Sequence, residues 1–297
     1  MKNKLNKIAR ETNLYLKDYI SKQKKSNLIA PIKYGLFSGG KKIRSKILVD
    51  IGKMFKVNYK TLIKIGAAVE CVHAYSLIHD DLPCMDNDAL RRGKPSTHVQ
   101  YGESTAVLAG NSLLTIAFEI LTAKNLNVSE KIKIELIKNL SECAGHSGVA
   151  GGQFLDLYYE KKKVSLKKVV DMQIKKTGKL FSFCCMVPLI VKNKDAKDIN
   201  FFSKLGSDIG LLFQIIDDLL DFTGDTNYLG KKTKKDKKRG KATIVDLLGY
   251  KKTTKYCDKI KLNLFKKLNK YGSKSKDIQE TIEYISIRNK WKKIINT

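Results

Sequence analysis

The sequence predicts an all-α protein folded as one large helical bundle. Apolar residues recur with helical spacing along nearly the whole chain, whereas the alternating pattern of strands is scarce. Only four prolines occur in 297 residues, and clusters of glycine, asparagine and aspartate separate the apolar segments. No low-complexity linker divides the chain. A single domain over residues 1–297 is therefore the simplest prediction.

Helices are expected wherever the apolar residues repeat with the helical period. In chain order the expected ranges are 4–24, 29–38, 42–55, 60–82, 103–124, 129–146, 165–191, 196–223, 243–269 and 276–292. The first is amphipathic, because Leu5, Ile8 and Leu16 alternate with lysines. A hydrophobic fraction of 42% is enough for these helices to share a sizeable core.

The sequence indicates a cytoplasmic protein without a transmembrane segment. The longest near-apolar run, 180–191, contains Ser182 and Pro188 and is too short to span a bilayer. The first twenty residues lack the continuous apolar core of a signal peptide. Six cysteines show neither a C-x-x-C pair nor zinc-ligand spacing, and most sit in apolar helical stretches, so they are expected as small buried thiols in a reducing compartment.

The chain is strongly basic, with 58 lysines and arginines against 29 acidic residues and a net charge of +29. Such a charge attracts nucleic acids, anionic membranes or anionic substrates. Lysine is spread along most of the chain, which favours compositional bias with substrate attraction as a by-product. Aromatic residues are not interleaved with the basic ones as single-strand binding requires, so no nucleic-acid partner is expected.

The first acidic stretch lies at the end of the range 60–82. Asp80, Asp81, Asp86 and Asp88 fall within nine residues, and two arginines follow at 91 and 92. Mg²⁺ is commonly held by one or two carboxylates together with substrate phosphates. Arginine forks match phosphate oxygens. The stretch therefore predicts a site for metal and diphosphate, the alternative being a solvated acidic helix end.

A second acidic cluster lies inside an apolar helix. Asp217 and Asp221 are four residues apart and share one helix face, with Asp218 beside them. Leucine, isoleucine and phenylalanine surround these acids in the sequence. Carboxylates in apolar surroundings need a cation or a hydrogen-bonding partner. We therefore expect the two acidic clusters to line two faces of one central cavity that holds Mg²⁺ ions around a diphosphate.

A basic glycine-containing stretch precedes these motifs. Gly39 and Gly40 allow close approach of the backbone, and Lys41 and Arg44 follow at the start of a helix, where anions are favoured. On the next helix His73 lies seven residues before Asp80, so both project the same way. Taken alone, such a histidine is more often a core residue than a ligand.

These motifs together resemble the trans-isoprenyl diphosphate synthases. The pairs Asp80-Asp81-x-x-x-x-Asp86 and Asp217-Asp218-x-x-Asp221 are similar to the two aspartate-rich motifs of that family. Gly39 to Arg44, Glu70 to His79, Leu90 to Pro95 and Lys176 to Gly178 match in the same order. The resemblance covers about residues 30 to 290 and is closest to the bacterial-type farnesyl or geranyl diphosphate synthases. It implies the all-α isoprenoid synthase fold and a homodimer.

The resemblance implies roles for particular residues. Asp80, Asp81, Asp86, Asp217 and Asp221 would hold Mg²⁺, about three ions per active site with Mn²⁺ as a substitute, and Asp218 would belong to the catalytic set. Isopentenyl diphosphate would bind Lys41, Arg44, His73 and Arg92. The allylic diphosphate would bind Arg91, Lys176, Thr177 and Gln214, under a loop carrying Lys231 and Lys241. Gln153 and Asp156 are secondary candidates.

The expected reaction is the Mg²⁺-dependent head-to-tail condensation of isopentenyl diphosphate with an allylic diphosphate. Tyr75 and Ser76 precede Asp80 by five and four residues, where the family sets product length. The aromatic Tyr75 favours the C15 product, farnesyl diphosphate. Three departures from the family pattern are Ser45 for proline, Asn111 for aspartate and Lys234 for glycine. Ser45 changes the helix start, whereas Lys234 and its lysine-rich loop affect closure over the diphosphate.

Several alternatives stay open at this level. The same chemistry would serve a geranylgeranyl or geranyl diphosphate synthase. A catalytically silent regulatory subunit is disfavoured because both acidic motifs are intact. A basic helical protein that binds nucleic acid or membrane surfaces would leave the acidic motifs unexplained. A terpene cyclase is disfavoured because the second motif is Asp-Asp-x-x-Asp and a second diphosphate site is present.

Overall fold

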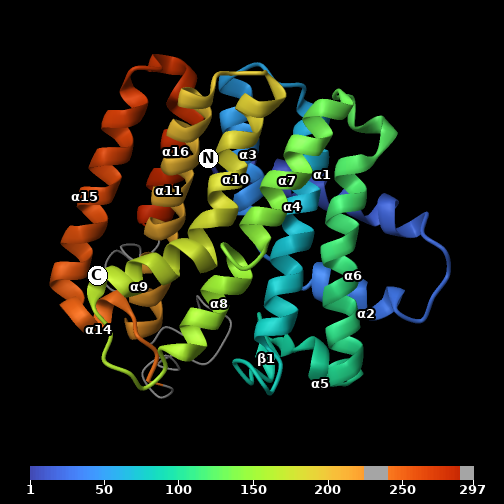
Figure 1. Cartoon of the computed structure of the whole chain (residues 1–297), viewed down its shortest axis with the longest axis horizontal. Coiled ribbons are helices and arrows are strands. Elements are labelled where there is room, and N and C mark those ends of the chain that lie inside the picture. Colours follow the sequence, from blue (N-terminus) through green and yellow to red (C-terminus); the bar gives the residue numbers. More distant parts are fainter. Residues whose placement is uncertain (224–239, 288–297) are drawn as a thin grey trace. The chain divides into compact units, whose positions relative to one another are not determined.

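The computed structural model describes residues 1–223 and 240–287 (Figure 1). These residues form two compact units, and each is described by itself. The N-terminal unit comprises residues 2–140 and 187–193, and the C-terminal unit comprises Met1, 141–186 and the part of the chain from 194 onward. The helices α7 (Glu130–Ala144) and α10 (Lys179–Val191) contribute residues to both.

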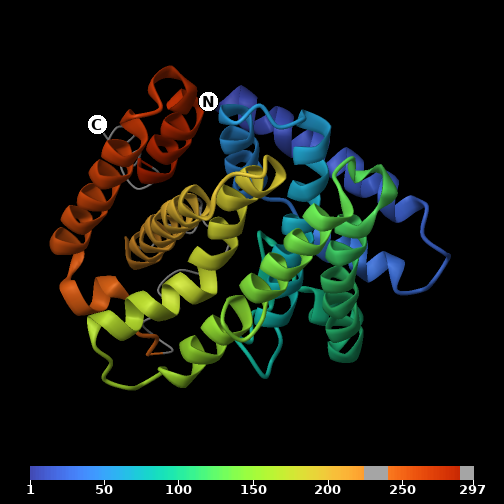
Figure 2. The same ribbon diagram turned by 45° about the horizontal axis from the view of Figure 1, so that its top comes forward.

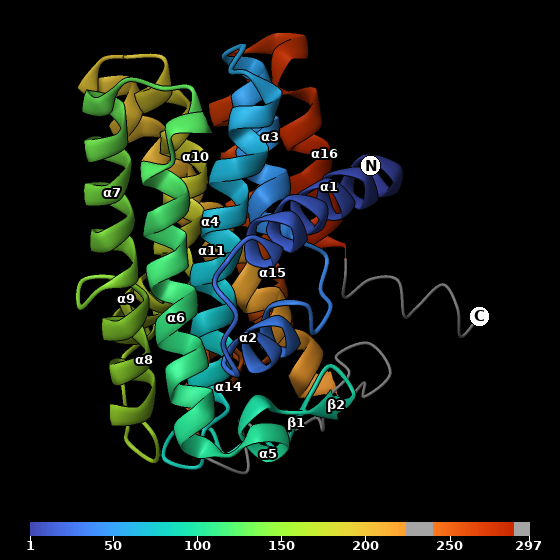
Figure 3. The ribbon, with the colours of Figure 1, turned by 90° about the vertical axis from the view of Figure 1, so that its right-hand side faces the viewer.

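The N-terminal unit is organised around the long helix α4. Helix α4 spans Tyr59–Asp80, and the other elements are α1 (Lys2–Ser21), α2 (Ile29–Leu36), α3 (Ile43–Met54), β1 (Leu90–Arg91), β2 (Lys94–Pro95), α5 (Thr97–Tyr101), α6 (Glu103–Thr122) and a 3₁₀ turn at Lys124–Leu126. Asn58 caps α4 by accepting a hydrogen bond from the backbone nitrogen of Thr61 at 3.2 Å. Helix α4 packs against α1, α3 and α6 (Figure 3). Its first motif aspartates therefore lie at the end of a firmly packed helix.

The helices α4 and α6 are long and apolar enough to cross a membrane by length and composition alone. They pack against each other, and most of the apolar stretch of α4 is buried within the unit. Core helices of water-soluble domains pass the same test. The described residues therefore show no clear transmembrane span.

The C-terminal unit is built around α11 (Ala196–Thr223). Its remaining elements are α8 (Val149–Tyr158), α9 (Leu166–Gln173), a π-helix (Ile174–Gly178), α14 (Ile244–Leu248), α15 (Tyr250–Asn269), a 3₁₀ turn at Gly272–Ser275 and α16 (Lys276–Ser286). The helices α15 and α16 pack against each other and against α11 (Figure 2). The π-helix packs against both α8 and α11, so it lies where the chemistry-bearing residues of this unit gather.

Glycines allow this close packing of the π-helix. A Cβ atom on Gly152 of α8 would lie 2.1 Å from the backbone nitrogen of Lys176. One on Gly210 of α11 would lie 2.6 Å from the Cα atom of Gly178. Real Cβ atoms do not approach so closely. The backbone of the π-helix is therefore held between two helices through positions that carry no side chain.

Over the described residues the predicted helices are found, with several differences, among them the unpredicted short helix α5. Helix α8 was missing from the periodicity prediction, because Gly151 and Gly152 weaken its apolar repeat. The range 165–191 contains the π-helix, where one turn is widened. The range 243–269 is broken at Gly249, whose φ of +74° ends α14. A two-stranded hairpin, β1–β2, also follows the first acidic motif.

Candidate active site

The first acidic motif is a closed turn at the carboxyl end of α4. Asp80 is the last residue of the helix, and its carbonyl oxygen accepts a hydrogen bond from the nitrogen of Asp86 at 2.8 Å. The carbonyl oxygen of Asp81 accepts one from the nitrogen of Asp88 at 3.1 Å. The chain thus folds back on itself and brings the acids of this motif together at one end of α4.

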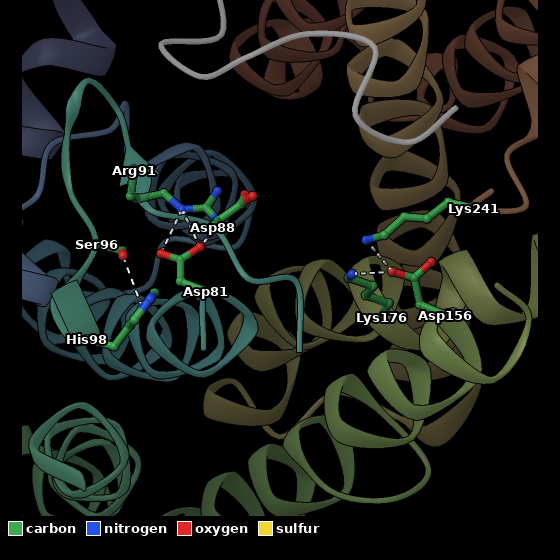
Figure 4. Close-up of polar contacts among 8 residues, drawn as sticks. All are labelled: Asp81, Asp88, Arg91, Ser96, His98, Asp156, Lys176 and Lys241. Carbon is green, nitrogen blue, oxygen red and sulfur yellow. Dashed lines mark hydrogen bonds and ion pairs between the residues drawn. The ribbon is translucent and has the colours of Figure 1, made fainter. Parts of the chain in front are cut away.

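Arg91 is drawn into this turn. Its Nε atom donates to the two carboxylate oxygens of Asp81 at 3.0 and 3.1 Å, and its guanidinium lies 3.7 Å from Asp88 (Figure 4). Burial raises the pKa of Asp81 above its ordinary value, although Arg91 opposes the shift. Burial acts to lower the pKa of Arg91, but Asp81 and Asp88 outweigh it and raise the pKa. The structure therefore joins a predicted metal-binding acid to a predicted diphosphate-binding cation.

The basic stretch lies beside the hairpin that follows the motif. The guanidinium of Arg92 donates to the carbonyl oxygen of Gly39. A Cβ atom on Gly40, whose φ is +105°, would lie 2.5 Å from Nη1 of Arg92. Glycine is favoured there, because a φ of +105° strains the backbone of any residue with a side chain, and a side chain would also displace the guanidinium. The structure thus brings Arg92 to the loop that carries Lys41.

His73 lies within reach of the same positive charges. Part of its surface is accessible to solvent. The surrounding protein atoms are the largest cause that holds the pKa of His73 well below its ordinary value. The cations of Arg44, Arg92, Lys42 and Arg91 lower the pKa further. The imidazole is therefore neutral at neutral pH. A neutral histidine beside four cations lies in a region of positive electrostatic potential, which favours the binding of an anion.

Two further residues, Glu70 and Lys42, organise this region, although neither was predicted as a site residue. Glu70 of α4 accepts hydrogen bonds from the backbone nitrogen of Ser45 at 3.2 Å and from its hydroxyl at 3.1 Å. The ammonium of Lys42 lies 3.7 Å from the other oxygen of Glu70. Lys42 and Glu70 are both buried. The only sequence signal was a carboxylate inside the apolar helix range 60–82.

The second acidic motif lies on α11, with Asp218 and Asp221 buried. Both carboxylate oxygens of Asp218 accept hydrogen bonds, from Nε2 of Gln173 at 2.6 Å and from Nε2 of Gln214 at 2.8 Å. The hydroxyl of Thr177 donates to the amide oxygen of Gln214 at 2.7 Å. Thr177 and Gln214, both predicted as allylic contacts, are thus brought together. Gln173 was not predicted.

Asp156 of α8 gathers the two predicted diphosphate-binding lysines of this unit. Its Oδ2 atom accepts from the ammonium of Lys176 at 2.7 Å and from that of Lys241 at 3.0 Å (Figure 4). Burial alone would raise the pKa of this carboxyl, but the two lysines outweigh it and hold the pKa far below the ordinary value. Its neighbour Gln153 is also buried. Asp156 therefore pairs with both predicted diphosphate-binding lysines, which makes it a stronger candidate site residue than the sequence indicated.

The predicted chain-length residues lie on α4 before the first motif. The ring of Tyr75 meets that of His79 edge to face, with centroids 5.0 Å apart. His79 is anchored in turn, because its Nε2 atom lies 3.0 Å from the carbonyl oxygen of Val107 on α6. The hydroxyl of Ser76 donates to the carbonyl oxygen of His73. The contact with His79 therefore restricts rotation of the Tyr75 ring.

The structure leaves some of the predictions untested. Lys231 and Lys234 lie outside the described residues, and so does most of the lysine-rich loop. Asn111 is exposed on α6. Over residues 1–223 and 240–287, no three acidic, histidine or cysteine side chains converge as a complete metal cage. Mg²⁺ seldom requires such a cage, because substrate phosphates and water complete its shell. Metal ligation by the aspartates stays a prediction.

Comparison with known proteins identifies the family. The polyprenyl synthetase family model matches residues 25–285. The chain belongs to this family. The farnesyl diphosphate synthase of Escherichia coli K12 is 39% identical to this polyprenyl synthetase over 268 residues, covering 89% of this chain and 90% of the relative. The resemblance inferred from the motifs is thus confirmed, and with it the prenyltransferase class.

Solved structures confirm the all-α fold of this polyprenyl synthetase. An FPP/GFPP synthase from Zymomonas mobilis superposes with a TM-score of 0.86 at 33% identity, covering 96% of this chain and 98% of that one. A geranyltransferase from Helicobacter pylori, solved with magnesium and isoprenyl diphosphate, gives a TM-score of 0.81 at 32% identity over 95% and 96% of the two chains.

Proposed function

We propose that this polyprenyl synthetase condenses isopentenyl diphosphate with dimethylallyl and geranyl diphosphates, with farnesyl diphosphate as its main product. The observation that carries the proposal is that each unit pairs an acidic motif with its own cluster of cations. Arg91 joins the first motif, and Lys176 and Lys241 gather on Asp156 in the unit that holds the second. A reaction between two diphosphates needs two such anion sites.

The donor chemistry of both motifs fits Mg²⁺. Hard divalent cations take carboxylate oxygens, and the acids at 80, 81, 86, 217 and 221 supply them. Asp218 fits a supporting role better, since both of its oxygens accept amide hydrogen bonds. Bound Mg²⁺ would neutralise charge on the diphosphate leaving group. About three ions per site and replacement by Mn²⁺ belong to this proposal.

The residues of the chain supply binding and charge, and no protein nucleophile is needed. The C1–O bond of the allylic diphosphate breaks, and the electron pair leaves with pyrophosphate. In the C-terminal unit Lys176 and Lys241 supply cations for that departing charge, and Arg91 is assigned to it by the family resemblance alone. Lys41, Arg44, His73 and Arg92 hold isopentenyl diphosphate, whose double bond attacks the allylic carbon. A proton then leaves the new cation, with pyrophosphate as the proposed base. The apolar helices exclude water that would quench the cation.

The proposal also covers the domain content, the oligomeric state, the cellular location and the product class of the protein. One polyprenyl synthase domain over residues 1–297 is supported by a family match that runs from residue 25 to residue 285. A homodimer and a cytoplasmic location agree with the family resemblance. A geranylgeranyl or geranyl diphosphate synthase is the alternative product class, and the Zymomonas mobilis neighbour is itself described with two products.

The deciding experiment is an incubation with isopentenyl diphosphate and either dimethylallyl or geranyl diphosphate, with and without Mg²⁺. Chromatography of the products should reveal Mg²⁺-dependent farnesyl diphosphate. A longer product would keep the chemistry and change the product assignment. Folded protein that gives no product with either primer would overturn the synthase proposal in favour of a regulatory subunit.

Replacing Tyr75 with alanine is expected to lengthen the product. The braced ring at the end of α4 would be lost, and the chain could then grow by another five-carbon unit. Product chromatography after incubation with geranyl diphosphate should show a C20 fraction that the parent lacks. Tyr75→Phe serves as the comparison, because it keeps the aromatic ring and removes only the hydroxyl. A Tyr75→Ala enzyme that still stops at C15 would show that Tyr75 is not the barrier.

A further inference from the structure

We propose that Gln173 is a positioning residue that couples the second acidic motif to the π-helix carrying Lys176 and Thr177. The inference rests on the proposed function and adds a residue that the motif pattern did not include. Gln173 is the last residue of α9, directly before the π-helix. Its amide nitrogen lies 2.6 Å from Oδ2 of Asp218 on α11.

The contact closes a ring of hydrogen bonds. Gln173 donates to Asp218, Gln214 donates to the other oxygen of Asp218, and Thr177 donates to Gln214. Gln173 and Thr177 are joined through the backbone of the π-helix. Each link holds the next, so the loss of one donor loosens the others. The ring thereby fixes Gln214 and Thr177, the two residues proposed to contact the allylic diphosphate.

The chemistry of the contact explains why an amide is needed at position 173. An ionised carboxylate only accepts hydrogen bonds, so the amide nitrogen must face Asp218. Gln173 is 4% exposed and Asp218 5%, which makes the bond charge-assisted and shielded from water. Within the described part of the chain, the amide oxygen of Gln173 has no hydrogen-bond partner. The described hydrogen bond of this side chain is therefore the one that it donates to Asp218.

The π-helix makes this coupling consequential. Single π turns within α-helices are frequent at functional sites, because the widened turn redirects side chains. Here it presents Lys176 to Asp156 and Thr177 to Gln214 in successive positions. Without the amide of Gln173, one carboxylate oxygen of Asp218 loses its hydrogen-bond donor. The start of the π-helix then loses this hydrogen bond to α11. We expect the allylic side of the reaction to weaken selectively.

The test compares Gln173→Met with Gln173→His in steady-state kinetics. Methionine keeps the length but cannot donate, whereas histidine keeps a ring N–H. Gln173→Met should raise the KM for geranyl diphosphate about tenfold, as the loss of a hydrogen bond to a charged group does, and leave the KM for isopentenyl diphosphate within about twofold. Gln173→His should recover most of that loss. Gln279→Met on α16, which removes a 3.0 Å bond to the hydroxyl of Ser275 in the preceding 3₁₀ turn, is the matched control.

Direct binding separates this inference from the proposed function. Isothermal titration of pyrophosphate in the presence of Mg²⁺ should show about tenfold weaker binding to Gln173→Met than to the parent, without need of turnover. A parent that binds pyrophosphate but makes no product would overturn the proposed function and leave the coupling measurable. Equal affinities of the parent, Gln173→Met and Gln173→His would overturn the coupling. So would equal rises in KM for both substrates, which a general structural defect produces.

Discussion

Asp156→Asn is expected to lower kcat about a hundredfold, the effect of disturbing cations arranged around a leaving group. The parent carboxylate holds the ammonium groups of Lys176 and Lys241 at 2.7 and 3.0 Å from one oxygen. Asparagine keeps the shape but removes the negative charge, so the two lysines repel each other and separate. Steady-state kinetics with geranyl diphosphate would measure the loss in kcat and the accompanying rise in KM.

The same substitution should destabilise the fold by about 3 kcal/mol, because it leaves two cations near each other without their buried partner. Urea unfolding at neutral pH would measure the difference. Asp208→Asn is the matched control. Its carboxylate pairs with Lys267 at 2.7 Å, but both side chains are about one-third exposed, so a change below about 1 kcal/mol is expected.

The pH dependence of that difference has a definite sign. The folded-state pKa of Asp156 is depressed by Lys176 and Lys241, so the folded protein favours the charged carboxylate. Its stabilisation is complete above the unfolded-state pKa of about 3.9 and is lost as the pH falls toward the folded-state value. The gap between parent and Asp156→Asn should be constant from about pH 6 to 8 and shrink below about pH 4. A gap that grows on acidification would contradict this assignment.

The motifs were predictable because their residues stand out against their surroundings. Asp217, Asp218 and Asp221 interrupt an apolar helix, and the structure places them on α11 with two of them buried. The glycines before α3 likewise marked a loop that must approach another group closely, and the structure shows that group to be the Arg92 guanidinium. Such features are local, so spacing along the chain is sufficient to detect them.

The residues that position those motifs could not be predicted, because their partners are distant in sequence. Gln173 and Asp218 are 45 residues apart, and Ser45 and Glu70 are 25 apart. Nothing in the spacing of an isolated glutamine or serine indicates which buried carboxylate it will meet. The π-helix was hidden for a related reason, since one widened turn leaves the apolar repeat of 165–191 nearly unchanged.

Glu70→Ala is expected to raise the KM for isopentenyl diphosphate more than about tenfold, because it removes an acceptor that positions the first turn of α3. Ser45 is the third residue of that helix, and its backbone N–H is one of the donors that a helix start leaves without an internal partner. Glu70 accepts this N–H and pairs with Lys42, whose φ of 50° begins the helix in a left-handed conformation. Arg44 lies within this anchored turn, and Lys41 directly precedes it.

The departure of Ser45 from the family pattern gains a physical reason here. Proline, the usual residue at this position, has neither the N–H nor the hydroxyl that Glu70 accepts. Ser45→Ala removes only the hydroxyl, so a smaller rise in KM, about threefold, is expected in the parent. In the Glu70→Ala background the same change should have a smaller effect, because only the hydrogen bond of the hydroxyl to the carbonyl oxygen of Gly66, at 3.2 Å, is then left to lose. Kinetics of the four proteins would give the coupling directly.

Two controls keep this prediction specific to the isopentenyl side. The KM for geranyl diphosphate should stay within about twofold in Glu70→Ala, since the described hydrogen bonds and ion pair of Glu70 go to Ser45 and Lys42, neither of which is a proposed allylic residue. Glu283→Ala, which breaks a partly exposed pair with Lys261 at 3.2 Å, should leave both KM values unchanged. Independent, multiplying effects of Ser45→Ala and Glu70→Ala would show that the two residues act separately and would overturn the coupling between them.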